Sequence, residues 1–377
     1  MSSVKTWIEI SRSALESNAK SLFELASGAE VIFVIKANAY GHGLLEVASV
    51  LSEAGAEWFA VDNLHEAITL RDAGYSQNLL ILGFVPRDGL EDAIKRDISF
   101  VVFNEDQISY IEARKGERRA KIHIPVETGL YREGFEIGEF EKIIERTRHI
   151  GNIELEGIQT HFADIEDVSL SRYADKQLNE YKKYLDILKE YDIDSIMQHT
   201  AASAASLLYS KTHFDLIRPG IALYGLWPSE DTKSRLQKLN SIFVLKPVLS
   251  WKTVIAQLKF VRAGESIGYG LTEMLERDSK IAVLPIGYYD GFDRVGMSSK
   301  AEVLVRGERC KIVGRICMNM CMADVTDILE VKNGDEVVLL GKQKDEEISV
   351  EEMAERMGSI NYEVVARLGA HIERRLI

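Results

Sequence analysis

The chain has 377 residues, of which 46% are hydrophobic and 28% charged, a balance typical of a folded globular protein and not of a disordered one. The 46 basic and 59 acidic side chains give a formal net charge of −13, which argues against nucleic acid as the main partner, because phosphate binding requires a basic surface. No apolar run approaches the roughly 18 residues of a membrane span, and residues 1–7 lack the apolar core of a signal peptide, so we expect a cytoplasmic protein without membrane contact.

Short apolar runs alternate with amphipathic stretches from residue 30 to about residue 220. Amphipathic stretches such as Leu44–Leu51, Leu64–Ala73 and Tyr173–Tyr191 separate runs that are apolar along most of their length, as strands buried on both faces are. The strand candidates are Val31–Lys36, Trp58–Val61, Leu79–Leu82, Phe100–Val102, Lys121–Val126, Leu155–Thr160, Ile196–His199 and Leu216–Arg218. This order predicts an α/β fold with a closed (β/α)₈ barrel of the TIM type. An open doubly wound sheet is the alternative, but its G-x-G-x-x-G fingerprint is missing after the first strand.

The pattern changes near residue 238, where strands and tight turns replace the alternation. Turn signals at residues 306–308 and 333–335 separate strands, and one helix is expected at Val350–Met357. The strands expected here are Leu249–Val261, Ile281–Ile286, Ala301–Val305, Lys311–Arg315, Met320–Val325 and Val337–Leu340. We therefore expect a barrel over residues 10–238 and a smaller, mainly β domain over residues 239–377, together with an N-terminal strand within residues 1–9.

The three cysteines, Cys310, Cys317 and Cys321, lie in one short stretch. Their odd number makes a disulfide framework improbable, and they lack the CxxC pairs of structural zinc sites. We expect buried thiols and no metal.

The first predicted strand of the barrel ends in a lysine, Lys36, within the segment Val34-Ile-Lys-Ala-Asn-Ala-Tyr-Gly-His-Gly43. Active sites of such barrels lie at the carboxyl ends of the strands. Burial lowers the pKa of an amine, which favours its attack on a carbonyl. A lysine whose charged end reaches solvent is the alternative, and position alone leaves both open.

The segment Lys36–Gly43 resembles the cofactor-lysine motif of alanine racemases, which are pyridoxal-phosphate enzymes of fold type III. The resemblance covers essentially the whole chain. Further segments agree with the family in order, namely Thr160–Ala163, Arg218–Ile221, Gly268–Gly270, Pro285–Tyr288 and Gly314–Met318.

The resemblance implies the roles of two proton carriers. Lys36 would bind pyridoxal phosphate and exchange a proton on one face of the substrate Cα, while Tyr269 would act on the opposite face. A tyrosine has an ordinary pKa near 10 and needs a supporting network, which His161 and Arg218 would supply.

The resemblance also implies how cofactor and substrate are held. Arg218 would face the pyridine nitrogen, to which a guanidinium can donate a hydrogen bond but hardly a proton. The substrate carboxylate would meet Arg132 and the backbone N–H of Met318. The cofactor phosphate would be bound by Tyr40, Ser203 and the backbone N–H groups of Gly220 and Ile221.

By the same resemblance, the active chain is a homodimer whose sites are shared between subunits, and its product is D-alanine for peptidoglycan. A racemase of broader specificity and a fold-type III decarboxylase are alternatives. The decarboxylases carry a Cys-Glu-x-x-Asp segment and a Gly-Gly-Gly loop, neither of which occurs here. A non-catalytic carrier of pyridoxal phosphate would lack the second domain.

The chain departs from the family at four positions. The lysine that many relatives carbamylate is Pro125, so that a bound anion or Glu127 would have to orient Arg132. The Asn-Ser of the phosphate loop is Ala202-Ser203, and the aspartate after Cys317-Met318 is Asn319. A tyrosine over the cofactor phosphate aligns with Ala370, next to His371, which suggests a wider substrate pocket.

Overall fold

A computed structural model describes residues 4–166, 171–238 and 243–377, which divide into two compact units. The larger unit consists of Ala14–Ala37 and Val47–Lys246, and the smaller one of Met1–Ser13, Asn38–Glu46 and Pro247–Ile377. None of the helices within the described ranges is long and apolar enough to cross a membrane.

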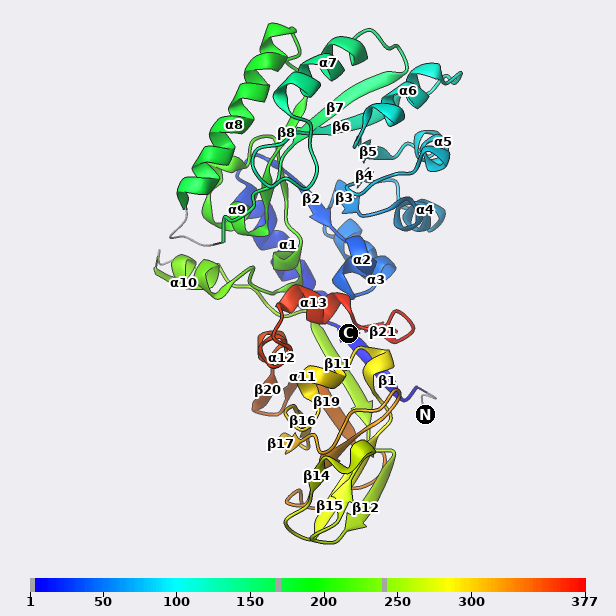
Figure 1. The fold of residues 1–377 in the computed structure, drawn as a ribbon, viewed down its shortest axis with the longest axis vertical. Coiled ribbons are helices and arrows are strands. Elements are labelled where there is room, and N and C mark those ends of the chain that lie inside the picture. Colours follow the sequence, from blue (N-terminus) through cyan, green and yellow to red (C-terminus); the bar gives the residue numbers. More distant parts are fainter. Residues whose placement is uncertain (1–3, 167–170, 239–242) are drawn as a thin grey trace. The chain divides into compact units, whose positions relative to one another are not determined.

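The larger unit is a parallel sheet with helices on its outer side (Figure 1). Its strand order is β8-β7-β6-β5-β4-β3-β2-β10-β9. Thr200 alone separates β8 from β9, so the two ends of this order are one interrupted strand and the sheet closes on itself. The strands are β2 (Glu30–Val34), β3 (Trp58–Val61), β4 (Asn78–Ile81), β5 (Ser99–Val101), β6 (Ala120–Pro125), β7 (Ile153–Gln159), β8 (Met197–His199), β9 (Ala201–Ala202) and β10 (Leu216–Arg218).

The predicted (β/α)₈ barrel is therefore confirmed, and its strands are buried runs of apolar residues. Local signals set several helix starts: the side chains of Asn63 and Asn104 accept hydrogen bonds from the N–H groups of Glu66 and Gln107. The helices are α1 (Arg12–Ala26), α3 (Leu44–Glu53), α4 (Leu64–Asp72), α5 (Leu90–Lys95), α6 (Glu105–Ala113), α7 (Ile137–Thr147), α8 (Ser171–Glu190), α9 (Ser203–Leu208) and α10 (Glu230–Lys238).

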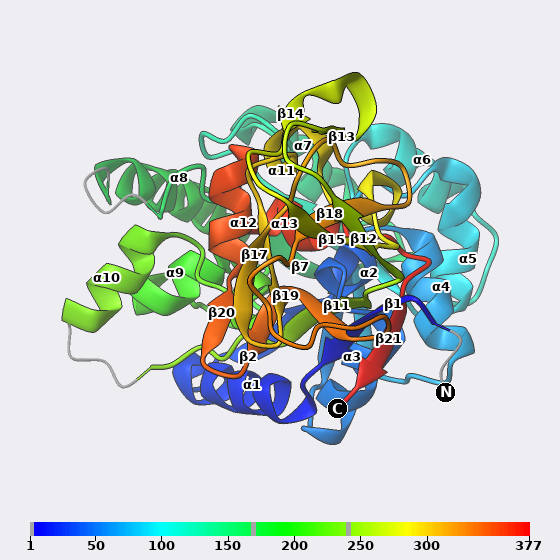
Figure 2. The ribbon, with the colours of Figure 1, turned by 90° about the horizontal axis from the view of Figure 1, so that it is seen from below.

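The smaller unit is mainly β, as expected. Strand β1 (Thr6–Ile10) pairs antiparallel with β11 (Leu249–Val254) and parallel with β21 (Glu373–Leu376), side by side in Figure 2. The same sheet holds β16 (Glu302–Val305), β17 (Glu308–Lys311), β19 (Glu336–Gln343) and β20 (Glu346–Ile348). Smaller sheets comprise β12 (Gln257–Val261), β15 (Ser279–Leu284) and β18 (Cys321–Asp324), and β13 (Ser266–Ile267) with β14 (Glu273–Met274). The helices are α11 (Arg294–Met297), α12 (Val350–Met357) and α13 (Asn361–Ala366).

The strand expected at Lys311–Arg315 is wrong, because β17 spans Glu308–Lys311. Arg306 and Gly307 have φ values of 56° and 83°, which form a two-residue turn and start the return strand at once. The run expected at Leu249–Val261 is two strands, β11 and β12. The thiols of Cys310 in β17 and Cys321 in β18 are buried as expected, whereas Cys317 is only partly buried.

Candidate active site

Lys36 does not close the first barrel strand, as the sequence suggested, but lies two residues beyond β2 at the start of α2 (Lys36–Tyr40). The four residues Ala37, Asn38, Ala39 and Tyr40 have φ values of 54°, 55°, 53° and 52°. They form one turn of left-handed helix, a conformation that costs an L-residue with a side chain roughly 1–2 kcal/mol. Such a turn persists only where other contacts hold it.

The contacts of Asn38 and Gly41 hold this turn in the smaller unit. The backbone oxygen of Asn38 accepts from Gly43 N–H at 2.9 Å, and its side chain accepts from Leu44 N–H at 2.9 Å, where α3 begins. The guanidinium of Arg374 donates to the oxygen of Gly41 at 2.9 and 3.1 Å. A Cβ at Gly41 would lie 1.9 Å from the oxygen of Val365, so only glycine fits.

In the larger unit, the Lys36 Nζ lies 3.8 Å from Oδ1 of Asp62, and the lysine side chain is 38% exposed. Asp62 follows β3 directly, so both residues lie past the carboxyl ends of adjacent strands. Gly83 leaves room for this aspartate, since a Cβ there would be 2.3 Å from the Asp62 backbone oxygen. Asp62 belongs to none of the motifs described in the sequence.

Burial and the charges of three cationic side chains act on the pKa of His161. Burial first, and then the charges of Arg218, Arg132 and Lys36, lower the pKa of His161 to about 3. The imidazole is therefore neutral near pH 7. The loop that carries it is held from α8 by Gln177, whose side chain donates to the oxygen of His161 at 3.1 Å and accepts from Ala163 N–H.

Arg218, at the end of β10, is buried and donates to the carbonyl oxygens of His199 at 2.7 Å and Thr160 at 2.9 Å. Burial lowers the pKa of Arg218 to about 10, so its guanidinium still carries its charge at neutral pH. Its Nη1 also donates to Nδ1 of His199.

This last hydrogen bond fixes the tautomers of two histidines. Because His199 Nδ1 accepts from a guanidinium, the proton of the neutral ring is on Nε2, which donates to Nδ1 of His123 at 2.7 Å. The Nε2–H of His123 then donates to the carboxylate of Glu156 at 2.9 Å. Burial, followed by the charge of Arg218, places the pKa of His199 well below its ordinary value. The row of donors therefore runs in one direction, from the cation of Arg218 to the anion of Glu156.

The local sequence of β6 and β7 makes room for this row. The pairing of the two strands shifts between Ile122 and His123, which leaves Glu156 as an extra residue in β7. The next residue is Gly157, where a Cβ would lie 2.2 Å from Nδ1 of His123. Burial acts to raise the pKa of Glu156, but the hydrogen bond from His123 keeps it below its ordinary value.

Ser203, Gly220 and Ile221 come together past β9 and β10. The Ser203 hydroxyl accepts from the N–H groups of Gly220 at 2.9 Å and Ala222 at 3.3 Å. Ile221 begins a 3₁₀ turn, Ile221–Tyr224. In this structure the Gly220 N–H predicted to meet a phosphate thus donates to Ser203. Tyr40 lies in the smaller unit, where the centroid of its ring is 6.3 Å from that of Tyr362. Burial raises the pKa of Tyr40 to about 12.

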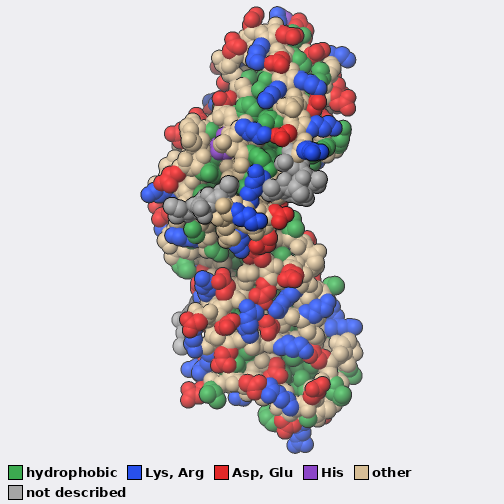
Figure 3. Space-filling model, turned by 90° about the vertical axis from the view of Figure 1, so that its left-hand side faces the viewer, with side chains coloured by type: hydrophobic (Ala, Val, Ile, Leu, Met, Phe, Trp, Pro, Cys, Tyr) green, Lys and Arg blue, Asp and Glu red, His purple; other side chains and the backbone are tan. Residues whose placement is uncertain are grey.

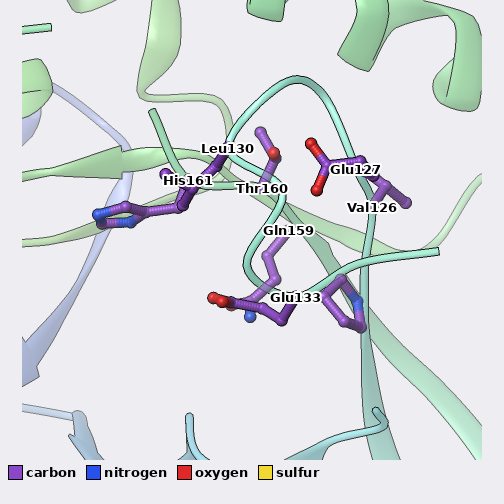
Figure 4. A pocket seen from close by; sticks show the side chains of 8 residues that line it. Val126, Glu127, Leu130, Glu133, Gln159, Thr160 and His161 are labelled. Atoms are coloured by element: carbon purple, nitrogen blue, oxygen red, sulfur yellow. The ribbon is translucent and has the colours of Figure 1, made fainter. Parts of the chain in front are cut away.

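A small pocket lies beside Pro125, the residue that stands in place of the expected lysine. Its lining includes Glu127, Glu133 and His161, and the imidazole points away from both carboxylates (Figure 4). The Glu127 carboxylate accepts hydrogen bonds from the N–H groups of Gly129 and Tyr131. Arg132 pairs instead with its neighbour, Glu133.

The remaining predicted residues, Tyr269 and Met318, lie in the smaller unit. Their side chains are 67% and 54% exposed. Gly268 and Gly270 flank Tyr269 with φ values of 76° and 78°, so the tyrosine projects from a tight turn. The backbone oxygen of Met318 accepts from Tyr289 N–H at 3.0 Å.

His371, beside Ala370, contacts two residues of the same unit. Its Nε2 lies 3.0 Å from Oδ1 of Asp290. Its ring stacks on that of Tyr289, with 4.6 Å between the ring centroids and an angle of 29° between the ring planes. These contacts account for the imidazole without reference to a substrate pocket.

Comparison with known proteins adds to this geometry. Residues 10–228 match the family model "Alanine racemase, N-terminal domain", and residues 248–376 match "Alanine racemase, C-terminal domain". The chain is 40% identical to the alanine racemase of Methanococcus maripaludis, over 98% of this chain and 97% of that protein. It is 41% identical to the alanine racemase of Halothermothrix orenii, over 98% and 96% of the two chains.

Solved structures agree over the same length. The crystal structure of alanine racemase from Bacillus anthracis with bound L-Ala-P is similar with a TM-score of 0.92 and 36% identity, over 100% of this chain and 96% of that one. The alanine racemase of Clostridium difficile 630 is similar with a TM-score of 0.91 and 34% identity, over 100% and 97% of the two chains.

Proposed function

The chain belongs to the alanine racemase family, and we propose that it interconverts L-alanine and D-alanine with pyridoxal phosphate as its cofactor. The observation that carries the proposal is the place of Lys36 just past β2 and of Arg218 at the end of β10, in a chain that matches both alanine racemase domain models. On the face shown in Figure 3, acidic and basic side chains are interspersed. In a chain of net charge −13, the cationic side chains of Lys36, Arg132 and Arg218 would suit a small anionic cofactor and a carboxylate substrate.

The donors at this site suit pyridoxal phosphate. When bound, this cofactor supplies an aldehyde that reacts with an amine and a ring that withdraws electrons from the substrate Cα. Lys36 would hold the aldehyde carbon, and Arg218 would donate to the ring nitrogen. Ser203 and the adjacent backbone would hold the phosphate in the larger unit, with Tyr40 as a further contact. In the row from Arg218 to Glu156 both ring nitrogens of His199 have hydrogen-bond partners, which fixes how the His199 ring meets the Arg218 guanidinium.

Racemisation requires proton carriers on both faces of Cα. In the proposal, Nζ of Lys36 exchanges a proton on one face and the hydroxyl of Tyr269 on the other. The exposure of Tyr269, at 67%, favours a homodimer in which this turn completes the barrel site of a second copy. Met318, which is also exposed, would contribute its N–H to the substrate carboxylate beside Arg132.

The product D-alanine would serve peptidoglycan synthesis, and the site of action would be the cytoplasm. The relatives described above are alanine racemases, which favours this reaction over decarboxylation.

A chiral assay of L-alanine, L-serine and L-lysine with added pyridoxal phosphate tests the proposal. We expect inversion of L-alanine above the other two, by more than the roughly 10–200-fold that one methylene provides. Release of carbon dioxide without inversion would contradict the proposed reaction. Comparable rates on all three amino acids would support the broader specificity suggested by Ala370.

A further inference from the structure

The guanidinium of Arg132 is held along one edge by its own neighbour. Its Nη2 donates to Oε1 of Glu133 at 2.6 Å, and its Nε donates to Oε2. Two parallel bonds to one carboxylate fix both the direction and the plane of a guanidinium. Within the part of the chain that the structure describes, no acceptor is bonded to Nη1, on the opposite edge.

The environment of the two side chains differs. The Glu133 side chain is 16% exposed and lines the pocket beside Pro125, whereas the Arg132 side chain is 59% exposed. The carboxylate is therefore the sheltered partner and the guanidinium the accessible one. The charge of Glu133 also acts on Arg218, where it opposes the effect of burial on the pKa.

Other groups near Arg132 do not provide this support. Pro125 has no polar side chain, and both oxygens of Glu127 accept backbone hydrogen bonds in the loop, from Gly129 and Tyr131. The sequence predicted that Glu127 or a bound anion would orient Arg132. The observed pairing with Glu133 supplies a negative charge from within the chain instead.

We propose that Glu133 is the positioning residue of Arg132: it holds one edge of the guanidinium and leaves the other edge for the carboxylate of the amino-acid substrate. This inference rests on the proposed function, because it takes Arg132 as the substrate-binding arginine. It differs from a competing role in which Glu133 occupies Arg132 and must be displaced by the substrate. A positioning residue lowers KM, whereas a competitor raises it.

Steady-state kinetics of Glu133→Gln and Glu133→Asp test the proposal, with Glu141→Gln as the matched control. Glu141 is exposed on α7 in the same unit. We expect KM for L-alanine to rise about tenfold in Glu133→Gln with kcat changed less than about threefold, because the lost interaction orients a binding group. Glu133→Asp should recover part of the loss, and Glu141→Gln should match the wild type.

A second measurement uses the chain without cofactor. The ¹⁵N–¹H signal of Arg132 Nε, assigned by its disappearance in Arg132→Lys, should exchange slowly with water in the wild type. We expect several-fold faster exchange in Glu133→Gln and no change in Glu141→Gln, because only the former loses the acceptor.

A lower KM in Glu133→Gln would show that Glu133 competes with substrate and would overturn the proposal. An unchanged KM together with an unchanged Nε signal would overturn it as well. If the wild-type chain inverts no amino acid, the proposed function itself fails. If it inverts alanine and the Glu133 variants behave like the wild type, only the inference about Glu133 fails.

Discussion

The two units present their functional residues in opposite ways. In the barrel, Arg218 is buried, and it is bonded to residues of two other strand ends, His199 and Thr160. In the smaller unit, Tyr269 projects from a turn between two glycines with two thirds of its surface exposed. Orientation in the barrel is thus set within the fold, whereas the smaller unit offers side chains that lack an opposing surface in the unit that carries them. The proposed homodimer would account for this difference.

Replacing Lys36 should have the largest effect, because in the proposal this amine both holds the cofactor and exchanges a proton. We expect Lys36→Ala to lose more than about four orders of magnitude in racemase activity, together with the visible absorbance of bound cofactor. Lys95→Ala, on α5, is the control and should retain both. Retained activity in Lys36→Ala would contradict the proposal that Lys36 is the catalytic amine of the barrel.

The variant Tyr269→Phe tests the role of the exposed tyrosine of the smaller unit. We expect a loss of about 10²–10⁴-fold, which is typical for removal of a general acid or base, with the cofactor absorbance retained. Mixing Tyr269→Phe with Lys36→Ala chains should restore part of the activity through hybrid dimers. No recovery, with subunit exchange verified, would mean that both carriers of one site come from the same chain.

Glu156→Gln tests whether the buried row depends on its terminal charge. Removing one member of a buried charged network should destabilise the chain by roughly 3 kcal/mol, measured by urea unfolding. We also expect an altered cofactor spectrum, because the row that begins at Arg218 would lose its terminal negative charge. Glu154→Gln, on the same strand, is the control. Equal stability and spectra in both variants would contradict a coupled row.

The low pKa of His161 should make the free energy of unfolding depend on pH, an effect of intermediate size. Its folded value of about 3 lies below the ordinary value of about 6.5, so the unfolded chain binds more protons between these limits. The stabilisation is complete above pH 6.5 and is lost as the pH falls, by at most about 1.4 kcal/mol per pH unit. His161→Gln should reduce this slope, whereas substitution of the exposed His65 on α4 should leave it unchanged.

The smallest expected change in the free energy of unfolding concerns the left-handed turn that begins at Ala37. Ala37→Gly should raise the free energy of unfolding by up to about 1 kcal/mol, because glycine adopts positive φ without strain. Ala113→Gly, at the end of α6, should instead lower it by about 0.5–1 kcal/mol. A destabilised Ala37→Gly would show that the alanine methyl group contributes contacts that outweigh the strain.

The barrel could be predicted because its strands are continuous apolar runs, and such a pattern survives in a single sequence. The strand expected at Lys311–Arg315 failed because the two-residue turn at Arg306 and Gly307 started the strand earlier. Lys36 was found by its position and motif, but the handedness of the turn that follows was not. That turn depends on Arg374 and Val365, which lie more than 300 residues away in the chain.

The supporting residues were missed for a similar reason. A histidine within an apolar strand, such as His123, indicates a buried polar contact. Its partners Glu156 and His199 could not be predicted, because a strand irregularity and packing bring them to it. The sequence proposed Glu127 as the carboxylate for Arg132 by analogy of position. Local backbone bonds had already taken that side chain, and Glu133 has the role because it is adjacent and sheltered.

The clamp on Gly41 limits how the segment Lys36–Gly43 can be reused. A peptide with this sequence, or a graft of it into another barrel, would relax to a right-handed coil, since the contacts with Arg374 and Val365 that hold the turn lie outside these eight residues. Protein engineers who wish to transplant the reactive amine would need to carry over the terminal strand β21 and the neighbouring α13 as well. The eight-residue segment that carries the reactive amine therefore depends on residues at the far end of the chain.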